Sequence, residues 1–230
     1  MTTRLYLVRH GATPLTAEDR FSGSENVHLS EEGRAQVTRL AKRLKDEVID
    51  AIYCSPLDRT LETAKIIAKP HQQLTLIAKD GFREISHGHW EGLSRKEVEE
   101  QFPEEYMAWE ADPFTFAPER GESGISVLAR ALPVIHEVVV KHKDKNIMVV
   151  SHKATLRIII SSLLGFDVRG YRDRLDQAPA CLNILDFKDS VRARLMLFND
   201  ISHYADHPHR PQKQLSRWWD TGNAQDKDQA

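Results

Sequence analysis

Apolar positions along the chain follow two patterns that alternate with each other. Compact apolar runs, typical of buried strands, occupy residues 4–10, 51–55, 74–77, 146–152, 181–187 and 193–199. Apolar residues at helical spacing occupy residues 31–46, 56–68, 125–142 and 154–165. This alternation predicts an α/β fold, a three-layer sandwich in which helices flank a mostly parallel central sheet.

Single residues mark where several of these helices should begin or end. Ser30 is a typical N-cap residue and precedes the first predicted helix, while Gly165 is expected to close the last one. Pro56 is expected at the start of the helix over 56–68. Pro133 lies inside the pattern over 125–142 and predicts a kink or an early break in that helix.

Residues 81–123 depart from both patterns. The stretch is rich in Gly and Pro and favours short polar helices at 94–101 and 103–111. We interpret it as a helical flap inserted into a domain that spans residues 1–205. Residues 206–230 form a polar tail with Trp218 and Trp219 as its large apolar side chains, and we predict that this tail is mobile.

Composition narrows the classes of function. The 230 residues carry 32 basic and 34 acidic side chains, and the formal net charge of −2 gives no reason to expect a nucleic-acid partner. Two cysteines provide no disulfide framework, and no window reaches the ~18 apolar residues of a membrane-spanning helix. These features predict a cytoplasmic protein without a membrane partner. They leave the oligomeric state open, with a homodimer among the alternatives.

Polar side chains gather at the predicted carboxyl ends of the strands, where α/β sheets bind their ligands. His10 and His152 each end an apolar run, while Arg59 and Glu84 follow two others. The guanidinium groups of Arg9 and Arg59 suit phosphate oxygens, and an imidazole can donate, accept or attack. The combination predicts a pocket for a phosphoryl group.

Two further features bear on this pocket. Main-chain N–H groups at helix starts after Gly11 and after His152 are expected to add donors for the same anion. His87 and His89 form an H-x-H pair, but the sequence offers no convergent third ligand, so we expect neither a metal site nor a cofactor.

The motifs that carry these residues follow one another along most of the chain. They are "LVRHGAT", "LSEEGRAQ", "IYCSPLDRTLETA", "FREISHGHWEGL", "RGES" and "VVSHKATLR". In these motifs and their order, the sequence resembles the histidine phosphatase, or phosphoglycerate mutase-like, superfamily and in particular its phosphatase branch. The resemblance covers residues 4 to about 203 and implies hydrolysis of phosphomonoesters through a phosphohistidine intermediate.

The resemblance implies a role for each catalytic candidate. His10 corresponds to the nucleophile that takes the phosphoryl group. Arg9, Arg59 and His152 correspond to the groups that hold the non-bridging oxygens. Glu84 corresponds to the acid that protonates the leaving alkoxide and then deprotonates the attacking water. No metal is implied, because these side chains supply the positive charge.

Candidate substrate-binding residues lie in the same motifs or near them. Thr16 stands where the family often has Asn, and Lys153 follows His152 where many members have Gly. His87 matches a histidine of metal-independent phosphoserine phosphatases, whereas Ser22 stands where those enzymes tend to have Gln. His203, in "NDISHY", is expected to line the pocket floor. The candidate substrate-binding set is therefore Thr16, Ser22, Gly23, His87, Lys153 and His203.

Three functions remain in competition. The leading hypothesis is a phosphatase for a small phosphorylated substrate: a sugar phosphate, a phosphoglycerate-like acid or phosphoserine. A 2,3-bisphosphoglycerate-dependent phosphoglycerate mutase is the alternative, but residues 92–123 contain Arg95 and Arg120 without the adjacent arginine pair of such mutases. An inactive regulatory or binding module is the third, and it would be favoured by loss of a catalytic residue, which the sequence does not show.

Overall fold

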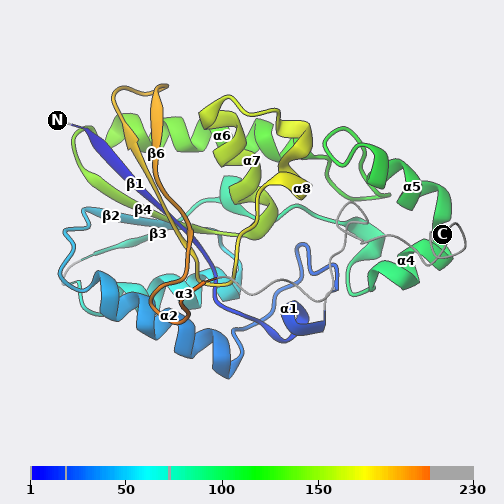
Figure 1. The fold of residues 1–230 in the computed structure, drawn as a ribbon, viewed down its shortest axis with the longest axis horizontal. Coiled ribbons are helices and arrows are strands. Elements are labelled where there is room, and N and C mark those ends of the chain that lie inside the picture. The colour runs from blue at the N-terminus through cyan, green and yellow to red at the C-terminus, as the bar shows by residue number, and fades with distance from the viewer. Residues whose placement is uncertain (1, 19, 72–73, 208–230) are drawn as a thin grey trace, which may run out of the picture.

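A mixed six-stranded sheet forms the centre of the molecule. The computed structural model describes residues 2–18, 20–71 and 74–207 (Figure 1). The strands are β1 (Thr3–Arg9), β2 (Ala51–Cys54), β3 (Leu76–Ala78), β4 (Asn146–Ser151), β5 (Leu182–Phe187) and β6 (Ala193–Asp200). Their order is β3-β2-β4-β1-β5-β6; the pairs among β1 to β4 are parallel, and β5 pairs antiparallel with both β1 and β6.

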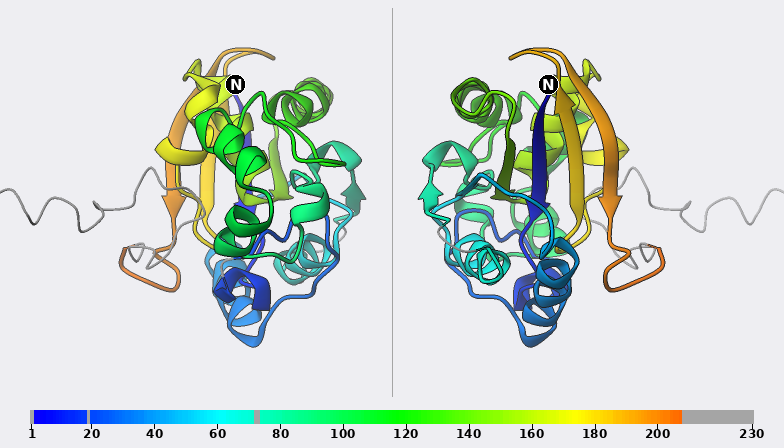
Figure 2. Two further views of the ribbon diagram at one scale, coloured as in Figure 1. Left: turned by 90° about the vertical axis from the view of Figure 1, so that its right-hand side faces the viewer. Right: turned by 90° about the vertical axis from the view of Figure 1, so that its left-hand side faces the viewer.

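Helices cover both faces of the sheet, which confirms the three-layer α/β sandwich (Figures 1 and 2). One face packs against α6 (Gly124–Lys141) and α7 (Lys153–Leu164), and the other against α2 (Glu31–Leu44) and α3 (Asp58–Ala68). Within β1, Leu5 and Leu7 join the first core, whereas Tyr6 and Val8 join the second. Alternate side chains of a strand point to opposite faces, so a continuous apolar run is buried on both sides.

The register of β1 and β4 sets the position of two histidines. Arg9 pairs with Ser151 in the parallel ladder, and the N–H of His10 donates to the carbonyl of Ser151 at 3.1 Å. His10 and His152 therefore leave neighbouring strands at the same level, although 142 residues separate them along the chain.

Helix boundaries follow the sequence signals with two exceptions. Ser30 caps α2 by accepting from the N–H of Gly33, and Gly165 ends α7 with a φ of 70°. The early break predicted at Pro133 is wrong, because α6 continues through it and buries an apolar face on the sheet. Pro56 does not start α3; it lies before Leu57, the extended residue that precedes the first turn.

The segment between β3 and α6 contains short elements with an aromatic core of their own. These are the 3₁₀ turns at Asp80–Phe82 and Gly88–Trp90, followed by α4 (Arg95–Gln101) and α5 (Pro103–Ala111). The core comprises Trp90, Val98, Tyr106 and Trp109 of this segment, together with Phe21 from the loop after β1. The remaining elements are α1 (Pro14–Glu18), a 3₁₀ turn at Val168–Gly170 and α8 (Tyr171–Arg174).

The proposed domain boundaries, 1–205 with a flap at about 81–123, stay a prediction. Most of the proposed tail, residues 208–230 with Trp218 and Trp219, lies outside the described residues. Across the part of the chain that is described, no helix combines the length and apolar character needed to cross a bilayer.

Candidate active site

A cavity of about 950 Å³ lies at the carboxyl ends of β1 and β4. Its lining comes from the loop after β1, the turn after β3, the first turns of α7, and the segment that follows α8. Eight of the residues predicted for the site line it: Arg9, His10, Thr16, Ser22, Gly23, Glu84, His87 and Lys153. Segments far apart in the sequence thus meet at one hollow.

The imidazole of His10 is held in one tautomer. Its Nδ1 lies 2.7 Å from the carbonyl oxygen of Gly11, and because a carbonyl only accepts, Nδ1 must carry the proton. Nε2 then keeps its lone pair. Burial, with the positive charges of Arg59 and Arg9 as smaller causes, lowers the pKa of His10 well below its usual value. The ring is therefore neutral at pH 7 and able to act as a nucleophile.

The ring of His152 is oriented by Arg59. Arg59 Nε donates to His152 Nδ1 at 3.2 Å, so the neutral ring carries its proton on Nε2. That Nε2 is buried and has no hydrogen-bond partner in the described part of the chain. The ring centroids of His10 and His152 lie 5.2 Å apart. His152 and Arg59 are not lining residues, but His152 lies next to His10 with an N–H donor unused.

Arg59 and Arg9 are themselves held by main-chain carbonyls. Arg59 Nη1 donates to the carbonyl of Glu25 at 2.6 Å and Nη2 to that of Gly23 at 2.8 Å. Arg9 Nη1 donates to the carbonyl of Gln177 at 2.6 Å, while its Nε is buried with no partner among the described residues. Both guanidiniums are thus fixed in place with N–H groups to spare.

The amides after Gly11 do not form the anion site that the sequence led us to expect. The N–H of Gly11 donates to Thr63 Oγ1 at 3.3 Å, and that of Ala12 donates to Gln36 Oε1 at 3.1 Å. Buried main-chain donors must find acceptors, and here side chains of α2 and α3 provide them. Side-chain cations, rather than this turn of backbone, are left to hold an anion.

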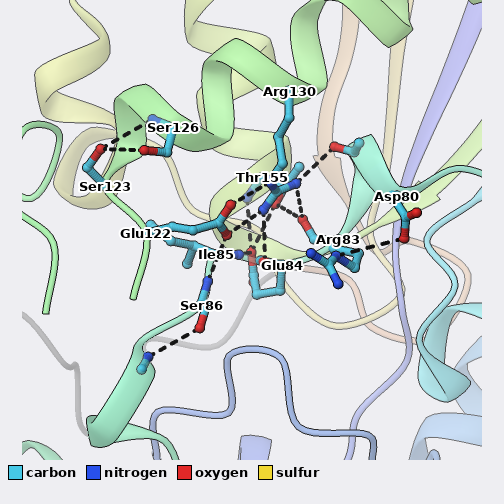
Figure 3. A network of polar contacts seen from close by, with 12 residues as sticks. Asp80, Arg83, Glu84, Ile85, Ser86, Glu122, Ser123, Ser126, Arg130 and Thr155 are labelled. Atoms are coloured by element: carbon cyan, nitrogen blue, oxygen red, sulfur yellow. Dashed lines mark hydrogen bonds and ion pairs between the residues drawn. The ribbon is translucent and has the colours of Figure 1, made fainter. Parts of the chain in front are cut away.

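The helix start after His152 is occupied by Glu84. Its carboxylate accepts from the N–H groups of Thr155 at 3.1 Å and Ile85 at 3.0 Å (Figure 3). It also accepts from the N–H of Ala154 at 3.2 Å. An acidic side chain is the usual partner of free N–H groups at a helix N-terminus. The expected anion-binding amides of α7 therefore position the candidate acid.

The turn that carries Glu84 is fastened by an ion pair. Arg130 on α6 donates from Nε to Glu122 Oε1 at 2.8 Å, and from Nη2 to the carbonyl of Glu84 at 3.0 Å (Figure 3). Glu122 Oε2 in turn accepts from the N–H of Ser86 at 3.0 Å. Residues on both sides of Glu84 are thus fixed to one rigid helix.

A second carboxylate fastens the loop with Ser22 and Gly23. Glu91 Oε1 accepts from the N–H of Ser24 at 3.0 Å, Ser86 Oγ at 2.9 Å and the N–H of His87 at 3.0 Å. One carboxylate therefore joins two segments of the cavity wall. Gly23 has a φ of +40°, and a Cβ there would lie 2.2 Å from Glu91 Oε1, so this contact requires glycine.

The remaining lining candidates are uncharged or apolar in character. Thr16 Oγ1 lies 2.9 Å from Thr13 Oγ1 in a hydroxyl pair. His87 packs edge-on against Phe21 and Trp109, at ring distances of 4.8 and 6.5 Å, and burial lowers its pKa. His87, Phe21 and Trp109 thus form an aromatic part of the cavity lining.

The structure corrects the expectation for His203. It is not a lining residue of the cavity, whereas its neighbours Ile201 and Tyr204 are. The turn after β6 directs His203 against Tyr204, with ring centroids 4.9 Å apart. Burial lowers its pKa to about 4. The lining at this turn comes instead from Ile201, Tyr204 and Ala205.

Arg157 and Asp176 are among the charged lining residues that the predicted set did not include. Arg157, in the second turn of α7, donates from Nη2 to Asp176 Oδ1 at 2.9 Å, and Lys153 Nζ lies 3.2 Å from the same oxygen. The spacing of four residues between Lys153 and Arg157 signals a shared helix face, but not which way that face points. Within the described ranges, no group of three or more His, Cys, Asp or Glu side chains could hold a metal ion.

Sequence comparisons place this geometry in a family. Residues 5–201 match the model of the histidine phosphatase superfamily (branch 1). The chain is 38% identical over 165 residues to phosphoserine phosphatase 1 of Hydrogenobacter thermophilus, covering 72% of this chain and 78% of that protein. It is 32% identical over 172 residues to a glucosyl-3-phosphoglycerate phosphatase of Mycolicibacterium vanbaalenii, covering 72% and 76%.

Solved structures agree with the sequence comparisons. Bacillus stearothermophilus YhfR superimposes with a TM-score of 0.81 at 29% identity, covering 87% of this chain and 98% of that one. A putative alpha-ribazole-5'-P phosphatase of Escherichia coli gives a TM-score of 0.80 at 25% identity, with coverage of 87% and 98%. The chain belongs to branch 1 of the histidine phosphatase superfamily, and it is a phosphoric monoester hydrolase of that family.

Proposed function

We propose that the chain hydrolyses small phosphomonoesters in two steps, with His10 as the group that carries the phosphoryl between them. The observation that supports this most directly is the hydrogen bond from His10 Nδ1–H to the carbonyl of Gly11. It leaves the lone pair on Nε2, the atom that must attack phosphorus. Burial keeps that atom unprotonated by lowering the pKa of the ring.

The phosphoryl oxygens are held by donors that have no other partner. Arg9 Nε and His152 Nε2–H are buried without acceptors among the described residues, and Arg59 retains N–H groups beyond those it donates to carbonyls. Donors fixed before the substrate arrives stabilise the charge that grows on the oxygens in the transition state. No metal ion enters this proposal.

Glu84 moves the proton in both steps. In the first, Nε2 of His10 bonds to phosphorus, the ester P–O bond breaks, and the leaving oxygen takes a proton from Glu84. In the second, water attacks phosphorus, its proton goes to Glu84, and the P–N bond breaks to release inorganic phosphate. The amides of α7 keep the carboxyl in one place throughout.

The substrate is a small phosphorylated metabolite: a sugar phosphate, a phosphoglycerate-like acid or phosphoserine. Two relatives are named for such compounds, a phosphoserine phosphatase and a glucosyl-3-phosphoglycerate phosphatase. A cavity of about 950 Å³ has room for substrates of this size. We assign contacts with the alcohol part of the substrate to Thr16, Ser22, Gly23, His87 and Lys153.

The proposed function goes with three predictions about partners, location and oligomeric state. The net charge of −2 supports a protein without a nucleic-acid partner, and two buried thiols, Cys54 and Cys181, support a reducing, cytoplasmic location. A homodimer stays a prediction.

Trapping the intermediate tests the proposal. The enzyme is mixed with ³²P-labelled substrate in EDTA and quenched in alkali, which preserves phosphohistidine. Label should be found on His10 of the wild-type chain and be absent from His10→Asn, which should also lose turnover. His28→Asn, at a histidine with 71% side-chain exposure, is the control and should label normally.

Two results would overturn the proposal. Turnover by His10→Asn at the wild-type rate would exclude His10 as the nucleophile. Conversion of 3- to 2-phosphoglycerate in the presence of 2,3-bisphosphoglycerate, faster than phosphate release, would show transfer rather than hydrolysis as the main reaction.

A further inference from the structure

One face of α7 presents two cations to the cavity beside the phosphoryl site. Lys153 and Arg157 lie one turn apart on this helix, and both line the cavity that His10 lines. Neither side chain takes part in the two chemical steps: Lys153 is assigned only a contact with the alcohol part of the substrate, and Arg157 has no assigned contact. Two cations beside the phosphoryl site are therefore available to bind another part of the substrate.

Arg157 has a buried donor without an acceptor. The residue is 9% exposed, and its Nη2 donates to Asp176 Oδ1 at 2.9 Å. Its Nε is buried and finds no partner in the described part of the chain. An unpaired buried N–H raises the free energy of the protein, and an arriving ligand oxygen removes that penalty.

The local charges do not balance. Asp176 Oδ1 contacts both Lys153 and Arg157, yet it carries a single negative charge. Arg9 adds a third positive charge, which contributes to lowering the pKa values of Lys153, Arg157 and Asp176. Glu84, another carboxylate that influences Arg157, is held by the amides of α7. This end of the cavity keeps a surplus of positive charge.

We propose that Lys153 and Arg157 form a second anion subsite, which binds a carboxylate of the substrate while the phosphoryl group faces His10. This rests on the proposed function, and it narrows the substrate to phosphomonoesters of hydroxy acids. Asp176 indicates the shape of the guest, because a carboxylate already bridges these two side chains. The ammonium of Lys153 and the free Nε–H of Arg157 provide one donor for each oxygen of a second carboxylate.

Two substrates that differ in the carboxylate alone test the subsite. They are D-3-phosphoglycerate and sn-glycerol 1-phosphate, which has the same configuration at C2 and a hydroxymethyl group in place of the carboxylate. The quantity measured is the preference, defined as kcat/KM for the first divided by kcat/KM for the second. We expect the wild-type chain to prefer 3-phosphoglycerate by about tenfold or more, the effect of one charge-assisted hydrogen bond.

Substitutions at the two ends of the bridge should change this preference in opposite directions. Lys153→Met removes one donor and should lower the preference by about tenfold, and Lys153→Arg should restore most of it. Asp176→Asn removes the competing carboxylate and should raise the preference. Lys188→Met, at an exposed lysine in the turn between β5 and β6, is the matched control and should leave it unchanged.

The outcomes separate this subsite from the phosphatase activity itself. Hydrolysis of both substrates with a wild-type preference near one would overturn the subsite and leave the phosphatase standing. A fall in preference for both Lys153→Met and Asp176→Asn would also overturn it, since a bridge that only stabilises the fold predicts no difference in sign. Absence of phosphohistidine on His10 would instead contradict the proposed function.

Discussion

Arg59 Nε donates to Nδ1 of His152 at 3.2 Å, and both side chains are almost fully buried. Three nitrogens of this guanidinium contact three different acceptors, two of them carbonyls of the loop 23–25. The planar fork of an arginine makes these contacts at once, and the single ammonium of a lysine cannot. The orientation of the His152 ring thus depends on the shape of Arg59 as well as its charge.

Arg59→Lys should therefore lower kcat by about 10- to 100-fold, the effect of one or two charge-assisted hydrogen bonds. Steady-state kinetics with p-nitrophenyl phosphate measure this change, and ¹⁵N chemical shifts of His152 report its tautomer. Arg34→Lys, at an exposed ion pair with Glu62, is the control and should keep the wild-type rate. A wild-type rate for Arg59→Lys would contradict the assigned role.

Glu84→Gln should slow hydrolysis of alkyl phosphates by about 10²- to 10⁴-fold and that of p-nitrophenyl phosphate much less. The amide cannot give a proton to a strongly basic alkoxide, whereas nitrophenolate leaves without one. Comparison of kcat/KM for the two kinds of ester measures the difference. Equal slowing of both would mean that Glu84 is not the acid.

Glu91→Ala should loosen the cavity wall formed by residues 22–24 and 86–87. It removes the acceptor of several N–H and O–H donors, and a buried donor without an acceptor costs about 1–3 kcal/mol. We expect lower stability to urea and a higher KM. Gly23→Ala should have the same effects, because its Cβ would displace the Glu91 carboxylate.

Glu100→Ala, at an exposed glutamate of α4, provides the control for these two variants. If Glu91→Ala leaves KM unchanged, the carboxylate supports the fold and does not position the loop.

The preference for D-3-phosphoglycerate over sn-glycerol 1-phosphate should fall above about pH 8. Burial, together with the charges of Arg157 and Arg9, lowers the pKa of Lys153 to about 8, against an opposing effect of Asp176. Below this pH the ammonium can bind a carboxylate, and above it the neutral amine cannot. Neither substrate titrates in this range. A pH profile of the preference tests the sign, and Lys153→Met should give a flat line.

Pro133→Ala should stabilise the protein by about 1–2 kcal/mol. Proline inside a helix removes one main-chain hydrogen bond and lowers helix stability, and the greater freedom of alanine in the unfolded chain offsets part of the gain. The site is exposed and lies inside the continuous helix α6, so no core packing changes. Urea denaturation measures the difference. A lower midpoint would show that the proline fits this helix without strain.

The periodic pattern predicted the layers because each type of element has its own signal. A strand that is buried on both faces is a continuous apolar run, and a helix that packs on a sheet has apolar residues at helical spacing. The pattern also predicted the helix over 125–142. Only the early break expected at Pro133 was wrong, because the buried side of α6, including Ile135 and Val138, outweighs the local effect of one proline. The third strand was placed at 74–77 but spans Leu76–Ala78. Such a short edge strand takes its bounds from its pairing with β2, which local composition does not encode.

The site was predictable to the extent that strand ends determine it. Helix N-termini were expected to bind the phosphoryl group, yet Gln36 and Glu84 accept from those amides. Which acceptor reaches a given N–H depends on packing between elements distant in the sequence. The same reason explains why Arg157 was missed and why His203 was assigned to the cavity.

The matched register of β1 and β4 has an evolutionary consequence. The separation of the two imidazoles is set by the spacing of hydrogen-bonded strands, a constant of protein backbones. The aromatic part of the cavity lining belongs to a separate small core, formed mostly by the segment between β3 and α6. Evolution can therefore replace that segment and change the substrate, while the distance between the two reactive imidazoles stays the same.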